Sequence, residues 1–390
     1  MIIRILVFLS LLYSFSSFAQ KYPHEFNEVP TLVDLLEDEE YHSGFLSTIK
    51  FGMGLNSFEH DLRVSDIMNV ESRELKLPSG KSLKYKIAYE IANPSYPLVI
   101  GHFGFSGDVD EGNAKYLAVN FRKDFPKNNL ILIQTLSSNN SLTENGYASL
   151  GGILDSKVIL ETVSDMKERF SLSPDVKIIC GSSSTTGVIQ AGIQLKKDPG
   201  FNMNGVYIQS GYDSMVEVYK AIKATYLSRK ERSRKGLEKT ELQQRIFVKL
   251  LLEKRVKNLL ESESVDKHIS IDEKESFDKL LERTYSTFES DYKAVYKEFH
   301  GTELLASNVG EYYEALRVSN YTEELDFDVM WVHAKDDPMS PYKNLANGFN
   351  KLDQLVDFTL VLMDDGGHAA FKETYGNFWL SSVMRLFVDS

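Results

Sequence analysis

The chain has 390 residues, of which 42% are hydrophobic and 26% charged, as in a soluble globular protein, and this length allows one large core with an insertion, or two domains. Its 44 basic residues are outnumbered by 56 acidic ones, and the net charge of −12 argues against nucleic acid or an anionic membrane as a partner. Because Cys180 is its only cysteine, an internal disulfide framework is excluded.

The first 19 residues have the pattern of a secretory signal. A positive charge in Met1–Arg4 precedes the apolar run Ile5–Tyr13, and Ser17-Phe18-Ala19 has small residues at the spacing of a cleavage site. The apolar run is shorter than the roughly 20 residues that a membrane span needs. We therefore expect cleavage after Ala19, export without a stable membrane anchor, and an N-terminal extension over residues 20–70 to which no role is assigned.

From residue 71 the chain alternates apolar strands with helices. A polar–apolar alternation over 72–91, interrupted by a tight turn at Ser79-Gly80, predicts a β-hairpin. Continuous apolar runs of strand length predict a parallel sheet covered on both faces, an α/β fold. The expected strands are 97–101, 130–133, 176–180, 205–208, 328–333 and 358–363, and the expected helices are 114–121, 156–170, 188–195, 342–352 and 374–387.

The alternation stops between residues 212 and 325. This segment contains no convincing strand, and three stretches have helical periodicity: Ser214–Arg229, Glu241–Leu260 and Glu275–Phe299. We interpret it as a helical cap inserted into the sheet domain, which itself comprises residues 71–211 and 326–390.

A strand passes directly into a helix at Val176–Ala191, through the run of small residues GSSSTTG. A serine at the apex of such a turn is typical of a nucleophile elbow, whose strained backbone requires small neighbours. We favour Ser183 as the nucleophile because it places Gly181 two residues before the apex. Ser184 and Ser182 are the alternatives, and a Ser/Thr-rich helix cap is the non-catalytic interpretation.

Two further loops carry an acid and a base. Asp337, beside Asp336, follows the strand expected at 328–333, and His368 follows the last expected strand. The carboxyl ends of parallel strands meet at one edge of a sheet, so these side chains should lie near the serine. A serine needs an imidazole to take its proton, and the imidazole needs a carboxylate to orient it. The hypothesis is a triad of Ser183, His368 and Asp337.

Four motifs, in this order, resemble those of the α/β-hydrolase superfamily: HFGFSG at 102–107, GSSST at 181–185, AKDDPMSP at 334–341 and GGHAAF at 366–371. The resemblance covers 71–211 and 326–390, with the insertion at the family's usual place. The acid of this family usually precedes a proline, which favours Asp337 over Asp336. The elbow differs from the family in having threonines where glycines are commoner.

The resemblance also implies an oxyanion hole made of two backbone N–H groups. By position these belong to Ser184, directly after the favoured nucleophile, and to Phe105 in the HFGFSG loop, with Phe103 as the alternative. Neither a metal nor an organic cofactor is implied.

The expected function is therefore that of an exported serine hydrolase acting on a small-molecule acyl substrate. A carboxylic ester is favoured, because the stretch from Tyr312-Tyr313 to His368 also resembles an esterase branch of the superfamily. The alternatives are a serine peptidase of the aminopeptidase type and a non-catalytic binding protein that keeps the scaffold.

Overall fold

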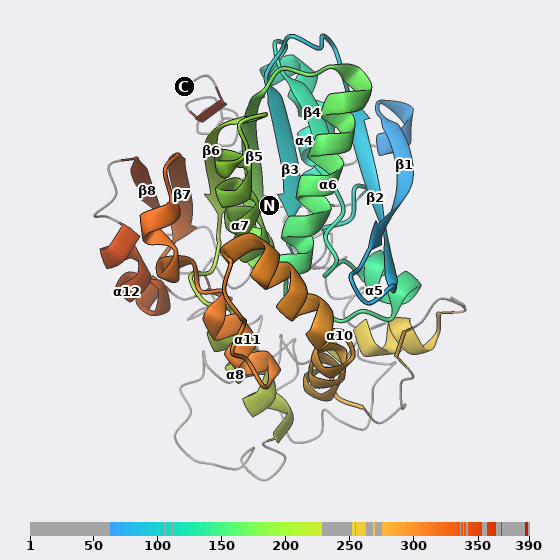
Figure 1. Cartoon of the computed structure of the whole chain (residues 1–390), viewed down its shortest axis with the longest axis vertical. Coiled ribbons are helices and arrows are strands. Elements are labelled where there is room, and N and C mark those ends of the chain that lie inside the picture. The colour runs from blue at the N-terminus through green and yellow to red at the C-terminus, as the bar shows by residue number, and fades with distance from the viewer. Residues whose placement is uncertain are drawn as a thin grey trace, which may run out of the picture.

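An eight-stranded sheet runs through the centre of the protein (Figure 1). The computed structural model describes residues 63–104, 107–110, 112–227, 252–253, 255–262, 268–269, 275–335, 337, 339–340, 342–352, 357–363, 368 and 387–388. The expected signal peptide, nearly all of the N-terminal extension and nearly all of the helix expected at 374–387 lie outside the described residues.

The strands follow one another in the sheet in the order β1-β2-β4-β3-β5-β6-β7-β8. The hairpin β1–β2 is antiparallel, β2 pairs antiparallel with β4, and all remaining pairs are parallel. This confirms a mostly parallel sheet that begins with a hairpin, whose turn is made by Gly80 at φ 85°. The strands are β1 (Asn69–Lys76), β2 (Ser82–Glu90), β3 (Leu98–Phe103), β4 (Asn129–Ile133), β5 (Asp175–Gly181), β6 (Asn202–Gln209), β7 (Asp328–Ala334) and β8 (Phe358–Met363).

Helices connect the strands as the apolar periodicity predicts. The helix expected at 156–170 begins three residues earlier, after Gly152. The helices are α4 (Gly112–Asp124), α5 (Asn139–Asn145), α6 (Ile153–Phe170), α7 (Thr185–Lys197), α8 (Met215–Leu227), α10 (Phe277–His300), α11 (Val309–Ala315) and α12 (Tyr342–Leu352), and the short 3-10 turns are η1 (Val64–Asp66), η2 (Ser182–Ser184), η4 (Val318–Asn320) and η5 (Thr322–Glu324).

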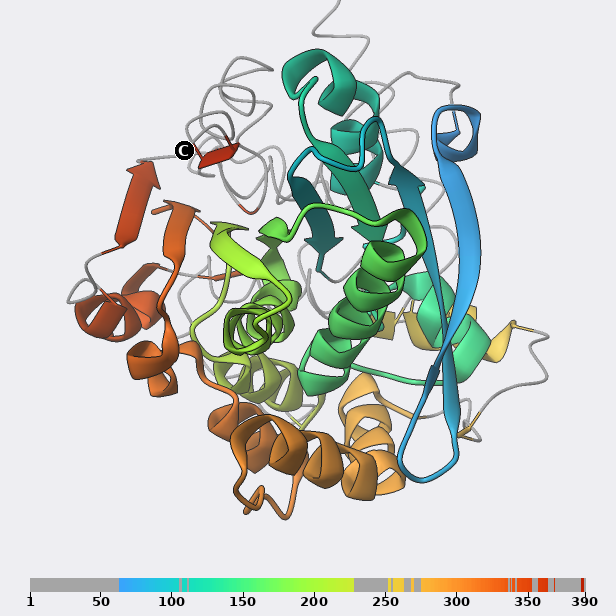
Figure 2. The ribbon, with the colours of Figure 1, turned by 45° about the horizontal axis from the view of Figure 1, so that its top comes forward.

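Each face of the sheet buries its own apolar cluster. Along β5, Ile178 belongs to the cluster that contains Val158 of α6 and Ile189 of α7, whereas its neighbour Ile179 belongs to the cluster that contains Phe121 of α4. Successive side chains of a strand point to opposite faces, so α4 covers one face and α6 and α7 cover the other (Figure 2).

Helices α8, α10 and α11 lie together at one end of the sheet (Figure 1). Between β6 and β7, the described residues contain no strand, in agreement with the expected helical segment. Helix α10 starts after Ser276, whose side chain accepts a hydrogen bond from the Lys279 N–H, and ends at Gly301. The helix expected at Glu241–Leu260 lies largely outside the described residues. None of the helices in the described part of the chain is long and apolar enough to span a bilayer.

Candidate active site

The turn between β5 and α7 places a serine directly after the strand. Gly181 still belongs to β5, because it pairs with Phe103 of β3 and Gln209 of β6. Ser182 follows with a left-handed backbone, at φ 54°, which residues with a side chain seldom adopt. The apex of the elbow is therefore Ser182.

The structure brings Ser182, and not the expected nucleophile Ser183, into contact with His368. The Ser183 side chain is 2% exposed, and its Oγ has no hydrogen-bond partner among the described residues. Ser184 is also buried, and its hydroxyl donates to the carbonyl of His102 at 2.7 Å. Ser183 was favoured because Gly181 lies two residues before it, whereas in the structure Gly181 is the last residue of β5 and Ser182 follows it directly.

Ser182, His368 and Asp337 form one continuous line of hydrogen bonds. The Oγ of Ser182 lies 2.8 Å from Nε2 of His368, and Nδ1 of His368 lies 2.8 Å from Oδ2 of Asp337. An ionised carboxylate only accepts, so Nδ1–H donates to Asp337 and Nε2 accepts the proton of the Ser182 hydroxyl. This is the geometry that activates a serine.

Asp337 is held as an anion in the interior. Burial by itself raises the pKa of this carboxyl, but His368, together with His333 and the Ser340 backbone N–H, outweighs burial and lowers the pKa below its ordinary value. The Met339 and Ser340 N–H groups donate to Oδ1 at 2.8 and 2.9 Å. His333 is buried, and its Nε2 lies 2.7 Å from the Ser340 carbonyl. Asp336, the neighbour of Asp337 in the sequence, lies outside the described residues.

The backbone N–H after the apex serine belongs to Ser183, at the start of the helical turn, where amide groups have no partner within the helix. The expected donor, Ser184, is one position further along the chain, because it was placed directly after Ser183. The residue after β3 packs closely against this amide, because a Cβ added at Gly104 would lie 2.7 Å from the Ser183 nitrogen. Phe105 lies outside the described residues, and Phe103 is the last residue of β3.

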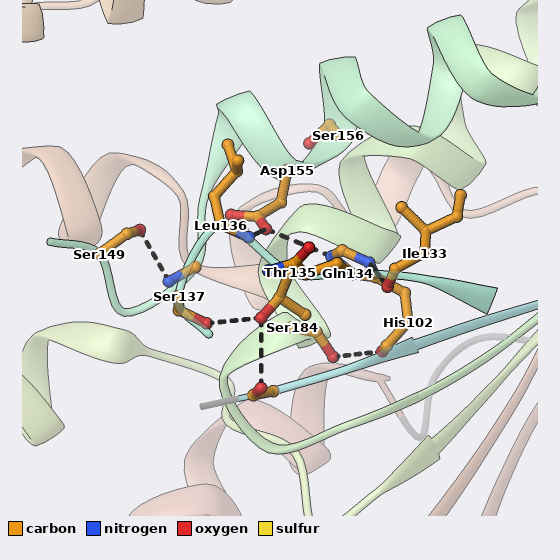
Figure 3. Close-up of polar contacts among 12 residues, drawn as sticks. His102, Ile133, Gln134, Thr135, Leu136, Ser137, Ser149, Asp155, Ser156 and Ser184 are labelled. Atoms are coloured by element: carbon orange, nitrogen blue, oxygen red, sulfur yellow. Dashed lines mark hydrogen bonds and ion pairs between the residues drawn. The ribbon is translucent and has the colours of Figure 1, made fainter. Parts of the chain in front are cut away.

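A buried network of polar side chains and backbone groups lies next to the elbow and includes Ser184 (Figure 3). Nε2 of His102, on β3, lies 3.3 Å from Oδ1 of Asp155, on α6, and both side chains are 1% exposed or less. Nδ1 of His102 is 3.1 Å from the Ile133 carbonyl, and the Leu136 N–H donates to Asp155 at 2.9 Å. Since the Ser184 hydroxyl donates to the His102 carbonyl, the network joins the elbow to β3, β4 and α6.

Two other kinds of reactive group can be examined in the described part of the chain. Among the described residues, no group of three or more His, Cys, Asp or Glu side chains is placed to hold a metal ion. Cys180 is buried in β5, and burial raises the pKa of its thiol, so it is an uncharged core side chain rather than a reactive thiolate.

Sequence reasoning missed three contributors to this site: Ser182 as the preferred apex, the His102–Asp155 pair, and Tyr212. The ring of Tyr212 lies against that of His368, with 5.9 Å between centroids. The sequence offered one indication for Tyr212, its position shortly after the strand expected at 205–208. Many other loop residues share such a position, so it does not identify Tyr212 as part of the site.

No family model and no curated protein sequence matches the chain. Among solved structures, the Pyrococcus furiosus esterase Pf2001 is similar at 13% identity and a TM-score of 0.50, over 85% of this chain and 96% of that chain. The Pyrococcus horikoshii acylaminoacyl peptidase matches at 12% identity and a TM-score of 0.48, over 83% of this chain and 41% of its own. The esterase domain of a Rhodothermus marinus protein matches at 10% identity and a TM-score of 0.44, over 82% and 98%.

The likeness to the Pyrococcus furiosus esterase extends over nearly all of that enzyme, and the mostly parallel sheet described above agrees with it. The protein has the α/β-hydrolase fold.

Proposed function

We propose that this protein is an exported serine hydrolase that cleaves carboxylic esters, with Ser182 as nucleophile, His368 as general base and acid, and Asp337 as the carboxylate that orients the imidazole. The observation that carries the proposal is the unbroken hydrogen-bonded line from Ser182 through His368 to Asp337. The buried carboxylate, with its lowered pKa, supports the imidazolium that forms when His368 takes the serine proton.

In the acylation half of the reaction, the Ser182 oxygen bonds to the carbonyl carbon while its proton passes to Nε2 of His368. The negative charge moves to the carbonyl oxygen, where the N–H of Ser183 is the first donor. The intermediate then collapses, the bond to the alcohol oxygen breaks, and the alcohol leaves with the proton from His368.

The deacylation half repeats these steps with water. The water oxygen bonds to the acyl carbon as His368 takes one of its protons. When this second intermediate collapses, the bond between Ser182 and the acyl carbon breaks, and His368 returns the proton to the serine oxygen. The acid is released, and no external reductant, oxidant or cofactor takes part.

Three further parts of the proposal rest on the sequence, on the described helices and on a solved structure, in that order. The N-terminal 19 residues support export, because they have the charge, apolar run and small residues of a cleaved signal. The described helices α8, α10 and α11, at one end of the sheet, support a helical cap over the site. The matched Pyrococcus furiosus esterase supports an ester substrate.

A fluorophosphonate probe tests the chemistry, because it phosphonylates an activated serine with loss of fluoride. Labelling of the wild type should be abolished in Ser182→Ala and should persist in Ser183→Ala, the matched control at the neighbouring position. If folded wild-type protein is not labelled at all, the protein is a binding protein on a hydrolase scaffold. If labelling is lost only in Ser183→Ala, the assignment of Ser182 is wrong.

The bond that is cleaved is tested separately, since the same triad also hydrolyses amides. We expect p-nitrophenyl esters to be cleaved with a higher kcat/KM than aminoacyl-nitroanilides. Faster cleavage of the anilides would replace the esterase proposal with a peptidase.

A further inference from the structure

Thr135, the second residue after β4, makes hydrogen bonds to two glycines of the loop that follows β3. Its side chain is fully buried, and its hydroxyl donates to the Gly104 carbonyl at 3.3 Å. Its backbone N–H donates to the Gly107 carbonyl at 3.1 Å, and the Gly107 N–H donates to the Gly104 carbonyl at 2.6 Å. Thr135 thus holds Gly104 and Gly107 together, and the mechanism described above gives it no role.

Gly104 lies directly against the elbow. A Cβ added at Gly104 would lie 2.7 Å from the Ser183 nitrogen and 2.8 Å from the Cβ of Ser182. Glycine allows this close approach of two backbones, so the position of Gly104 determines the space beside the Ser183 N–H, the first donor to the oxyanion.

The Gly104 carbonyl matters for a second reason. Its peptide group also carries the N–H of Phe105, which the sequence predicts as the second donor to the oxyanion. Because a peptide group is planar, an anchored carbonyl oxygen restricts the direction of the N–H at the other side of the same group.

We propose that Thr135 is a positioning residue of the oxyanion hole and that it acts by holding the Gly104 carbonyl in place. This inference rests on the proposed hydrolase function. The Thr135 hydroxyl bonds to a backbone carbonyl rather than to a reacting atom, so its effect on the reaction passes through Gly104.

The direction of the hydrogen bonds follows from the protons available. The Gly104 carbonyl can only accept, so the single proton of the Thr135 hydroxyl is committed to it. The Ser137 hydroxyl lies 3.1 Å from Oγ1 of Thr135 and is therefore the donor between the two (Figure 3). The Ser137 carbonyl accepts a hydrogen bond at 2.6 Å from Arg255, in the segment between β6 and β7. Contacts thus lead from that segment through Ser137 and Thr135 to Gly104.

The placement of oxyanion donors can be measured separately from the stability of the fold. These donors act where negative charge develops, on the carbonyl oxygen of the substrate. In a thionoester, sulfur replaces this oxygen, and sulfur accepts hydrogen bonds only weakly. The ratio of kcat/KM for an ester to kcat/KM for the matching thionoester therefore reports on the donors. A loss of folded enzyme lowers both values equally and leaves the ratio unchanged.

The test is the variant Thr135→Val, which keeps the shape of the side chain and removes the hydroxyl. With p-nitrophenyl acetate, we expect kcat/KM to fall about tenfold, which is less than the loss of about a hundredfold or more when an oxyanion donor itself is removed. With p-nitrophenyl thionoacetate, kcat/KM should fall by less than about threefold, so the ratio should decrease. Thr135→Ser retains a hydroxyl and should keep the wild-type ratio.

Thr162→Val is the matched control. Thr162 is a buried threonine on α6, and its hydroxyl lies 3.1 Å from that of Tyr85 on β2. Its replacement removes a buried hydroxyl that makes its hydrogen bond elsewhere, so the ratio should stay at its wild-type value. Ser137→Ala removes the donor to Thr135 and should lower the ratio by a smaller factor than Thr135→Val. It serves as the test variant if Thr135→Val does not fold.

An unchanged ratio in folded Thr135→Val would overturn the inference while leaving the proposed function intact, as would an unchanged ratio in Ser137→Ala if the valine variant does not fold. An equal decrease in Thr162→Val would also overturn it, because the ratio would then report on stability. Absence of both fluorophosphonate labelling and ester cleavage in the wild type would instead refute the proposed function, and the role of Thr135 with it.

Discussion

The carboxylate of Asp337 is buried and is nevertheless stabilised as an anion. Hydrogen bonds from the backbone of Met339 and Ser340 occupy one oxygen, and His368 occupies the other. These interactions favour the charged form over the neutral form more than burial opposes it, so the pKa of the group is lower in the folded protein than in the unfolded chain. The ionisation of this residue should therefore contribute to the pH dependence of stability.

The variant Asp337→Asn tests this dependence. A lowered folded-state pKa adds to stability above the unfolded pKa of about 3.9, and the contribution disappears as the pH falls through the folded value. At pH 7 we expect Asp337→Asn to lower the free energy of unfolding by about 1–3 kcal/mol. Urea unfolding at a series of pH values should show this difference shrinking below about pH 4. A difference of the same size at pH 7 and pH 3 would contradict the ionised state of Asp337.

The sequence was enough to place Asp337 and His368 near each other, but it was not enough to fix the register of the elbow. Asp337 and His368 follow expected strands, and the structure joins them by a hydrogen bond. The serine next to them was misplaced because small residues surround all three candidates, so the steric rule for an elbow admits each of them. What singles out Ser182 is the pairing of Gly181 with β3 and β6, a contact with strands distant in the chain.

At the scale of secondary-structure elements, Asp155 connects the first turn of α6 to two strands. Its Oδ1 accepts the N–H of Leu136 after β4 and faces His102 at the end of β3. The strands and the longer helices follow from apolar periodicity, whereas the short helices α5 and α11 were not expected. The connection through Asp155 does not follow from periodicity, because it depends on β3 and β4 lying side by side, and the order of parallel strands is set by packing rather than by local sequence.

We expect Asp155→Ala to lower the free energy of unfolding by about 3 kcal/mol or more, since it leaves a buried N–H and a buried imidazole without their partner. The matched control is Asp165→Ala on the same helix. The Asp165 side chain is 49% exposed and pairs with Arg73 at 2.6 Å, so its removal should have an effect below about 1 kcal/mol. Urea unfolding measures both variants. Similar effects of the two substitutions would show that the His102–Asp155 pair does not support the elbow region.

At the scale of the whole molecule, the helices between β6 and β7 are joined to the sheet domain through tyrosine hydroxyls. The N–H of Ile153 donates to the hydroxyl of Tyr312, and the N–H of Leu150 donates to that of Tyr313, each at 3.0 Å. Both amides belong to residues next to the turn before α6. This turn lies in close contact with the elbow, because a Cβ added at Gly151 would lie 2.0 Å from the Ser183 carbonyl oxygen. The helical segment and the nucleophile thus share one supporting loop.

The helix expected within Glu275–Phe299 buries one side, with Phe277, Phe288 and Tyr292 in the core. The sequence did not predict what the tyrosines contribute beyond packing. The Tyr292 hydroxyl meets that of Tyr147 at 2.8 Å, next to the same loop. Hydrophobic periodicity identifies which side of a helix is buried, but it contains no information on which backbone amide a buried hydroxyl will satisfy.

The substitutions Tyr312→Phe and Tyr313→Phe test whether this loop couples the helical segment to the nucleophile. Each removes the acceptor of a buried N–H, so each should lower the free energy of unfolding by about 1–3 kcal/mol, whereas Tyr207→Phe, which removes a hydroxyl without a described partner, should be nearly neutral. Since both amides flank one short turn, the double variant should lose less than the sum of the single losses. We also expect slower fluorophosphonate labelling of Ser182, although neither hydroxyl bonds to a triad residue. Additive losses with an unchanged labelling rate would mean that the helices are docked on the sheet domain without influencing the elbow.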